Sequence, residues 1–123
     1  MGRTAARTVT PTVSNMIAAA EALPLTGLVT STPQGIASRI IARTSAGNMT
    51  VFAFDAGQGL TEHTSPYEAF IIVLDGDVTL TVGGTAVRAR PGTITRLPAT
   101  VAHAVDAQVA SRLLLVMLRD GTP

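Results

Sequence analysis

The chain has 123 residues, 46% of them hydrophobic and 14% charged, and its mean hydropathy is +0.38. This length predicts a single domain with its own hydrophobic core. All nine basic residues are arginines spread along the chain, and the net charge is only +1, so we expect no nucleic-acid partner. So few charges on so apolar a chain indicate that a partner covers part of the apolar surface.

Neither a membrane span nor a disulfide framework is expected. The longest apolar runs, Ala69–Leu74 and Leu113–Leu118, hold six residues each, whereas a spanning helix needs roughly 20. The stretch before Pro24 resembles a signal peptide, but Glu21 interrupts its apolar part. The chain has no cysteine, which excludes disulfides and thiolate metal sites. We therefore expect a cytoplasmic protein with no membrane partner.

Residues 1–35 are expected to form an N-terminal arm with a short helix. Ser14 is suited to cap a helix over Asn15–Leu23, in which Met16, Ile17, Ala20 and Leu23 share one face. Pro24 ends the helix, because a proline disfavours the helical conformation of the residue before it. A helix of about nine residues is marginal alone and needs a surface to lie on.

Residues 36–123 show the all-β pattern of short apolar runs separated by turns. Val78–Val82 alternates apolar residues with threonines, and Gly83-Gly84 predicts a two-residue hairpin turn. The predicted strands are Ile36–Thr44, Met49–Asp55, Glu68–Asp75, Val78–Val82, Thr85–Arg90, Thr93–Leu97, Val101–Asp106 and Arg112–Arg119. Eight short antiparallel strands with no helix between them favour an all-β double-stranded β-helix (jelly roll) or a small barrel.

Two of these strands are apolar on both faces. They contain the runs Ala69–Leu74 and Leu113–Leu118, and a strand without alternation is usually buried on both sides. One face fills the barrel interior, so the other must meet a second subunit or the N-terminal arm. A homodimer is therefore expected, with an interface of more than roughly 1,000 Å².

Two segments carry the residues of most chemical interest. The first reads Gly57-x5-His63-x-Ser65-x3-Ala69-x6-Gly76, and the second reads Gly92-x5-Pro98-x-Thr100-x2-His103-x3-Ala107. The glycine, proline and histidine spacing resembles the two motifs of the cupin family, G-x5-H-x-H-x3–4-E-x6-G and G-x5-P-x-G-x2-H-x3-N. The resemblance covers about residues 49–118 and implies a cupin barrel over residues 36–123.

The resemblance also implies where a metal site would lie, and that its ligand set is depleted. Cupins hold a metal with three histidines and one glutamate. Here His63 and His103 match, whereas Ser65 stands in place of the second histidine and Ala69 in place of the glutamate. The resemblance implies that the two histidines face each other across the barrel mouth. We expect them to converge within about 5 Å of a shared point, because the motif spacing preserves both outer ligand positions.

Two interpretations of this pair stay open. In one, His63 and His103 hold a divalent ion (Zn, Fe, Mn, Ni or Cu) weakly, completed by water, by a ligand or by another side chain. In the other, the site is a former metal site, and the histidines hydrogen-bond in a dry or water-filled pocket. Glu62 and Glu68 are the candidate substitute ligands, but strand alternation turns both away from the site, unless a bulge near Pro66 re-aims Glu68.

The function expected from the sequence is that of a single-domain cupin binding a small molecule. Its pocket would centre on His63 and His103, with Ser65 and Tyr67 beside them as further ligand-binding residues. The alternative is a small-molecule enzyme, of the isomerase, cyclase or dioxygenase type, using a histidine-bound metal or a histidine as general base. A fold that carries so many activities does not choose among them.

Overall fold

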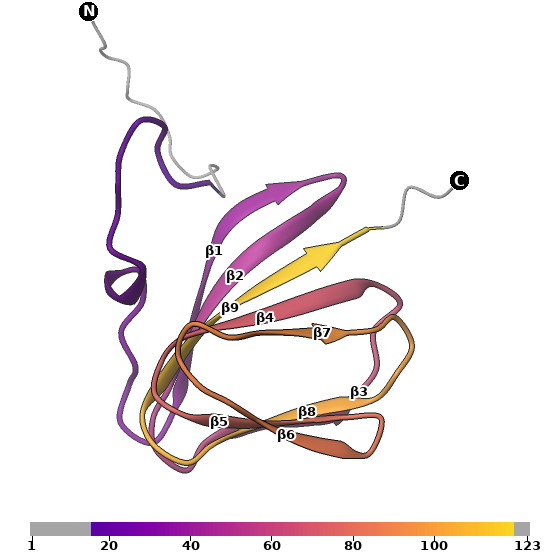
Figure 1. The fold of residues 1–123 in the computed structure, drawn as a ribbon. Coiled ribbons are helices and arrows are strands. Elements are labelled where there is room, and N and C mark those ends of the chain that lie inside the picture. Colours follow the sequence, from indigo (N-terminus) through magenta and orange to yellow (C-terminus); the bar gives the residue numbers. More distant parts are fainter. Residues whose placement is uncertain (1–15, 120–123) are drawn as a thin grey trace, which may run out of the picture.

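Two antiparallel β-sheets make up the body of the molecule (Figure 1), as given by a computed structural model that describes residues 16–119. The five-stranded sheet has the order β1-β2-β9-β4-β7, and the four-stranded sheet has the order β3-β8-β5-β6. The strands are β1 Ile36–Thr44, β2 Gly47–Phe54, β3 Gly59–His63, β4 Glu68–Asp75, β5 Val78–Val82, β6 Thr85–Ala89, β7 Ile94–Leu97, β8 His103–Ala107 and β9 Ser111–Leu118. The all-β jelly-roll prediction is confirmed. No helix in residues 16–119 is long and apolar enough to cross a membrane.

The eight predicted strands are all present, and a ninth was not predicted. Three of them, β1, β4 and β5, have the predicted bounds, and the other five differ by one or two residues at one or both ends. The unpredicted strand is β3. Its residues Gly59–His63 include one apolar side chain and show no alternation, so only its pairing with β8 makes it a strand.

The barrel core lies between the two sheets and follows from strand alternation. In β4 the buried residues are Ala69, Ile71 and Val73, which point inward, while the residues between them point outward. Phe54, Leu80, Leu97 and Leu113 are each at most 2% exposed and fill the space between the sheets.

A second apolar cluster lies on the opposite side of the five-stranded sheet. Its buried members, here called the outer cluster, are Leu28, Ile41, Val51 and Leu114. Leu114 follows Leu113 of the barrel core directly, so β9 is buried on both faces, as its unbroken apolar run predicted.

The N-terminal arm covers this outer cluster. Ile17, Leu23, Leu28 and Val29 of the arm pack with the sheet residues, and Figure 1 shows the arm running outside the barrel. Arginines of the sheet fasten it: Arg112 Nε donates to the carbonyl of Val29 at 2.9 Å, and Arg39 Nη1 donates to that of Leu28 at 3.2 Å. Of the two covers expected for the apolar strands, the arm is therefore present.

The helix predicted over Asn15–Leu23 is wrong in its described part. Residues 16–23 are not helical, and the described arm contains one turn of 3-10 helix, η3 at Leu25–Gly27. Ser14 and Asn15 lie outside the described residues. Ala20 has a φ of +63°, which no right-handed helix accepts, and the Ile17 amide donates instead to the Ile41 carbonyl at 2.9 Å. Contacts with the sheet outweigh the weak helical preference of so short a segment.

The turn between β5 and β6 has the predicted geometry. Gly83 and Gly84 have φ values of +56° and +85°, as a primed hairpin turn requires. A Cβ on Gly84 would meet nothing within 4 Å, so a substitution there acts only through the backbone.

We expect Gly84→Val to lower the free energy of unfolding by about 1–2 kcal/mol, because a β-branched residue is strained at positive φ. Gly84→Asn is the control, since asparagine tolerates the left-handed region. Urea unfolding measures both variants. Equal stability of Gly84→Val and the wild type would mean that the backbone adopts another turn in solution.

A second prediction tests the cover provided by the arm. Leu114 and Leu118 lie on the same face of β9, but Leu114 is 7% exposed in the outer cluster, whereas Leu118 is 47% exposed. We expect Leu114→Ala to cost about 2–4 kcal/mol and Leu118→Ala less than about 1 kcal/mol. Equal losses in urea unfolding would show that the arm does not bury Leu114.

Candidate functional site

The two histidines of the chain meet where β3 and β8 pair. β3 ends at His63, β8 begins at His103, and the two residues are direct partners in the ladder. Their Nε2 atoms lie 3.1 Å apart, with the ring centroids at 4.4 Å and the ring planes at 72°. The predicted convergence of the imidazoles is confirmed.

An irregularity in β3 is what turns His63 inward. Leu60 pairs with Val105 and His63 pairs with His103, so β3 advances three residues where β8 advances two. The extra residue reverses the alternation of side chains, and both Leu60 and His63 line the barrel cavity. In a regular strand Leu60 would share its face with Glu62 and not with His63. Sequence reasoning missed this bulge, because nothing in Gly59–His63 marks it.

Each imidazole also contacts a main-chain carbonyl through its other nitrogen. Nδ1 of His63 lies 2.8 Å from the oxygen of Thr61, and Nδ1 of His103 lies 3.3 Å from the oxygen of Val101. Because carbonyl oxygens only accept, both contacts require N–H groups at Nδ1. The contact between the two Nε2 atoms requires a third hydrogen, but two neutral imidazoles carry only two. A neutral pair therefore has one hydrogen too few for its three contacts.

Burial opposes protonation of the histidine pair, which would supply the missing hydrogen. His103 is 8% exposed, and its burial lowers the pKa of the imidazole below the usual 6.5, helped by the charge of nearby His63 and opposed by the hydrogen bond to Val101. His63 is exposed at the end of β3. The site thus favours a neutral His103 whose Nε2 is directed at the other ring.

The cavity behind the histidines is small and apolar. Its volume is about 30 Å³, enough for a water molecule, which needs a cavity of roughly 10–15 Å³. Apart from His63 and His103 its walls are hydrophobic: Phe52, Leu60, Ile71, Leu97, Val105, Leu113 and Leu115. The space beside the histidines can therefore hold one ion or one water molecule.

Ser65 and Tyr67, the other predicted ligand-binding residues, follow His63 but have partners of their own. Ser65 Oγ accepts a hydrogen bond from the Tyr67 amide at 3.2 Å, and the Ser65 carbonyl accepts one from Thr100 at 2.7 Å. The Tyr67 ring lies under the Arg119 guanidinium at 5.1 Å, and Arg119 Nη1 is 3.4 Å from its hydroxyl. Neither residue lines the cavity behind the histidines, and the polar groups of both have partners other than the histidine pair.

The substitute carboxylates lie away from the pair. Glu68 Oε1 is 2.7 Å from Arg96 Nε, and Oε2 accepts from the Ala99 amide at 2.9 Å. These hydrogen bonds, with that from Arg96 the stronger, lower the pKa of Glu68 below its usual 4.5. Glu62 is exposed. Residues 16–119 contain no group of three histidine, cysteine, aspartate or glutamate side chains that could hold an ion together.

The loop before β8 carries backbone strain. Thr100 has a φ of +67°, which is rare for a β-branched residue. Its amide donates to the Ser65 carbonyl at 2.7 Å, so the loop is tied to the connection that follows His63. Such strain persists where surrounding contacts over-determine the backbone, and here the hydrogen bond from Thr100 to Ser65 links the two histidine-bearing segments.

We expect the metal-free protein to lose stability as the pH falls below about 6.5, the usual histidine pKa. Because the pKa of His103 is lowered in the folded state, the unfolded chain binds its proton first, so stability decreases through this window. Glu68 and Asp77 have pKa values below their usual 4.5 and 3.8, so their contributions are lost only at lower pH.

Urea unfolding at about pH 7.5 and about pH 5.5, on either side of the histidine pKa, measures this effect. His103→Gln is the control, because it keeps a polar side chain that does not titrate. An equal decline in the wild type and in His103→Gln would assign the acid sensitivity to another group.

Comparisons with known proteins support the fold. The chain resembles a conserved protein of unknown function from Streptococcus pyogenes, with 29% identity, a TM-score of 0.81, and 92% of this chain and 98% of that chain covered. A cupin superfamily protein from Desulfitobacterium hafniense is 20% identical, with a TM-score of 0.80 and coverage of 89% and 100%. A cupin 2 conserved barrel domain protein from Leptotrichia buccalis is 27% identical, with a TM-score of 0.73 and coverage of 76% and 46%. No curated protein matches the chain.

A family model confirms the resemblance seen in the sequence. The model of the cupin domain matches residues 50–118, which is more than half of the 123 residues and contains both histidine-bearing segments. The matched region spans eight of the nine strands, from within β2 to the end of β9. The chain therefore belongs to the cupin family.

Proposed function

We propose that the protein binds a small molecule at the mouth of the barrel through a divalent metal ion held weakly between His63 and His103. The observation that carries this proposal is the 3.1 Å distance between two Nε2 atoms whose Nδ1 atoms both contact carbonyls.

The donor geometry fits a first-row ion. Histidine nitrogens lie about 2.0–2.1 Å from zinc, so two ligands of one ion can be at most about 4.2 Å apart. The observed 3.1 Å lies within this limit. Histidines that bind metals usually donate their other N–H to a carbonyl or carboxylate, which is the pattern of both rings here.

A metal ion between the rings would also take the place of the hydrogen that the neutral histidine pair lacks. With an ion between the Nε2 atoms, both Nδ1–H groups remain free to donate to the carbonyls of Thr61 and Val101. Burial favours a metal ion over a shared proton between the two rings, because burial lowers the pKa of His103 and so opposes its protonation. When bound, the ion supplies Lewis acidity and positive charge, while the chain supplies two neutral nitrogen ligands and an apolar wall.

Two ligands hold an ion weakly and leave its charge uncompensated. Ser65 and Ala69 supply no imidazole or carboxylate, and Glu68 is engaged with Arg96. A first-row ion seeks four to six donors, so several positions remain for water or for a ligand. An ion that keeps its full charge favours anionic oxygen donors, and we propose a small carboxylate or enolate-forming molecule as the ligand.

The small size of the cavity argues for a ligand bound at the mouth. Pockets that enclose drug-sized molecules measure about 300–1,000 Å³, whereas the cavity here measures about 30 Å³. The ion would fill the inner space, and the ligand would approach from the exposed side of His63. Ser65 and Tyr67, which follow His63 in the chain, would flank it.

This arrangement favours ligand binding over oxygenase chemistry. Oxygen activation on non-haem iron typically uses a facial set of three protein ligands, and residues 16–119 contain no such group. An isomerase or cyclase would need a base beside the ligand, and both ring nitrogens of each histidine already have contacts.

Metal titration tests the proposal. We expect the purified protein to bind one Zn²⁺ or Co²⁺ per chain with a Kd of about 1 µM or weaker (about 8 kcal/mol), less than the roughly 10–16 kcal/mol of structural zinc sites. His63→Ala should abolish binding, while Glu62→Ala, the adjacent exposed residue, should not. Oxalate serves as a chelating dicarboxylate. It should tighten Co²⁺ binding by about tenfold or more, because a ligand that completes the coordination shell of the ion makes the binding of metal and ligand mutually dependent.

The metal affinity should also fall with pH. Imidazole must be deprotonated to bind a metal, so affinity decreases as the pH drops below about 6. Calorimetry with Co²⁺ across this range gives the profile. Retention of the ion through prolonged dialysis against a chelator, or equal binding by His63→Ala, would contradict a weak site formed by two histidines.

A further inference from the structure

The inner face of the five-stranded sheet continues beyond the cavity behind the histidines. Leu97, which lines that cavity, is paired with Ala69 of β4, and Ala69 is paired with Met117 of β9. Met117 is in turn paired with Asn48 of β2, and Asn48 with Arg43 of β1. Directly paired residues share a face, so one row of side chains leads from the wall of the cavity to an arginine near the end of β1.

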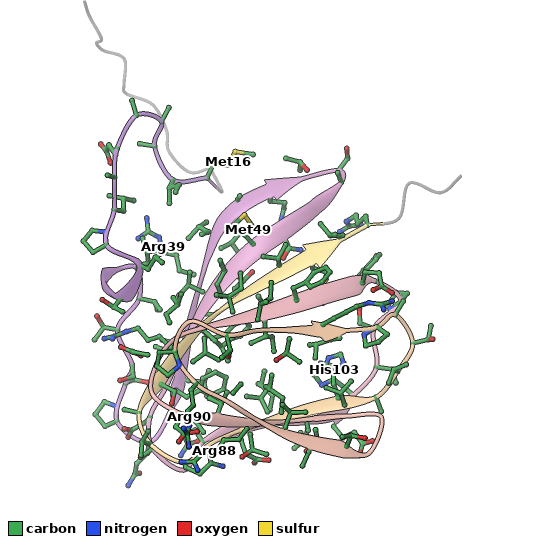
Figure 2. All side chains as sticks on the ribbon, in the orientation of Figure 1. Met16, Arg39, Met49, Arg88, Arg90 and His103 are labelled. Carbon is green, nitrogen blue, oxygen red and sulfur yellow. The ribbon has the colours of Figure 1, made fainter. Side chains whose placement is uncertain are left out.

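A bulge in β1 brings Arg43 to this face. In a regular strand Arg43 would share the face of Arg39, which donates to a carbonyl of the arm on the outer face. The register of β1 shifts between Ile40 and Ala42, and such a shift reverses the alternation of the side chains that follow. Figure 2 shows Arg39 beside the arm, on the far side of the sheet from His103. Arg43 therefore lies on the inner face, toward the histidines.

A second arginine lies on the same face at the end of β9. Arg119 follows β9 and Tyr67 precedes β4, and continuing the register of the two strands makes these residues the next pair on the face of Met117 and Ala69. The two side chains are in contact. The Arg119 guanidinium lies 5.1 Å from the centre of the Tyr67 ring, and Nη1 lies 3.4 Å from the hydroxyl oxygen.

Neither of these arginines is paired with a carboxylate in the described part of the chain. The ion pairs of residues 16–119 use other arginines, namely Arg88, Arg96 and Arg112. Arg43 and Arg119 are both exposed. The aromatic ring beneath the Arg119 guanidinium attracts its charge and orients its plane, while the edge of the guanidinium keeps N–H donors for a further partner.

We propose that Arg119 is an anion-binding residue of the barrel mouth, which takes the second carboxylate of a linear dicarboxylate whose first carboxylate lies on the ion between the histidines. This inference rests on the proposed function and narrows its ligand to a dianion. A guanidinium matches a carboxylate with two parallel hydrogen bonds, and Arg43 on the same face adds positive charge that attracts a dianion. Met117 and Ala69 provide an apolar floor for the carbon chain between the two ends.

The strand geometry sets the length of this ligand. Ala69 is buried next to Leu97 of the cavity wall and so marks the inner end of the mouth. Arg119 lies one strand across from Ala69 and two residues beyond its partner Met117, which separates the Cα atoms of Ala69 and Arg119 by about 8 Å. Oxalate, in which the carboxylates are joined directly, is too short to reach both ends. A longer dicarboxylate such as adipate is the suitable probe.

Titration of the metal-free protein with adipate tests the anion site without the ion. We expect nitrogen NMR of the arginine Nε–H groups to show a saturable shift of the Arg119 signal. Arg90 is the matched control, because it is exposed and forms no ion pair within residues 16–119, and Figure 2 shows it at the end of the barrel away from His103. An unmoved Arg119 signal, or an equal shift of the Arg90 signal, would overturn the inference.

A pair of matched ligands tests the bridge between the two ends. Adipate and hexanoate have the same carbon chain and differ in the second carboxylate. In the Co²⁺-loaded protein we expect adipate to bind about tenfold or more tightly than hexanoate, and we expect this advantage to disappear in Arg119→Gln and to persist in Arg90→Gln. The ratio of the two affinities within each variant cancels any change in metal binding.

The outcomes separate this inference from the proposed function. Equal affinities for adipate and hexanoate in the wild type, or an advantage of adipate that survives Arg119→Gln, would overturn the inference while the metal site stands. Failure of the wild type to bind Co²⁺ would instead overturn the proposed function and the bridge with it, and the metal-free titration would then decide the anion site alone.

Discussion

The burial of β9 on both faces is the constraint on which the rest of the structure depends. β9 lies at the centre of the five-stranded sheet, between β2 and β4, and places Leu113 in the barrel core and Leu114 in the outer cluster. A central strand with apolar residues on both sides is stable only if both sides are covered. The four-stranded sheet covers the inner side and the arm covers the outer side. The arm therefore follows the sheet, through Ile17 and Leu28, and is not helical over residues 16–23.

A second constraint, the bulge in β3, decides the chemistry of the site. With regular pairing, Glu62 would accompany Leu60 into the apolar cavity, and an unpaired carboxylate would be costly there. With the bulge, His63 points inward and Glu62 is exposed. His63 itself stays exposed at the end of β3, and its neutral imidazole can line the apolar cavity at a lower cost than a carboxylate. One inserted residue thus gives the barrel a pair of nitrogen ligands and keeps carboxylates outside.

The family motifs and the strand pattern predicted most of the fold, because both depend on local features. Alternation in Val78–Val82 and glycines at Gly83 and Gly84 determine a hairpin without reference to distant residues. The prediction was wrong where contacts between residues distant in the sequence decide the structure. Residues 16–23 have an apolar periodicity that fits a helix, yet the face they contact belongs to a sheet that begins at Ile36.

The candidate site was predicted in the same uneven way. The spacing of the motifs predicted that His63 and His103 meet, and strand alternation predicted that Glu68 turns away from them. The cavity volume was not predictable, because it depends on how Phe52, Leu97 and Leu115, from three different strands, fill the room beside the histidines. The hollow between the β1–β2 hairpin and the end of β9 was not predictable either, because its shape arises from the path of the hairpin relative to β9.

The two faces of β4 and β9 have different surroundings. Ile71 and Leu115 line the cavity behind the histidines, while the neighbouring Phe70 and Val116 face the opposite side of the sheet. Because side chains alternate along a strand, a residue on the outer face contributes no side chain to the histidine site. A substitution on the outer face can therefore reach the histidine pair only by displacing the backbone of β4 or β9, which close packing resists.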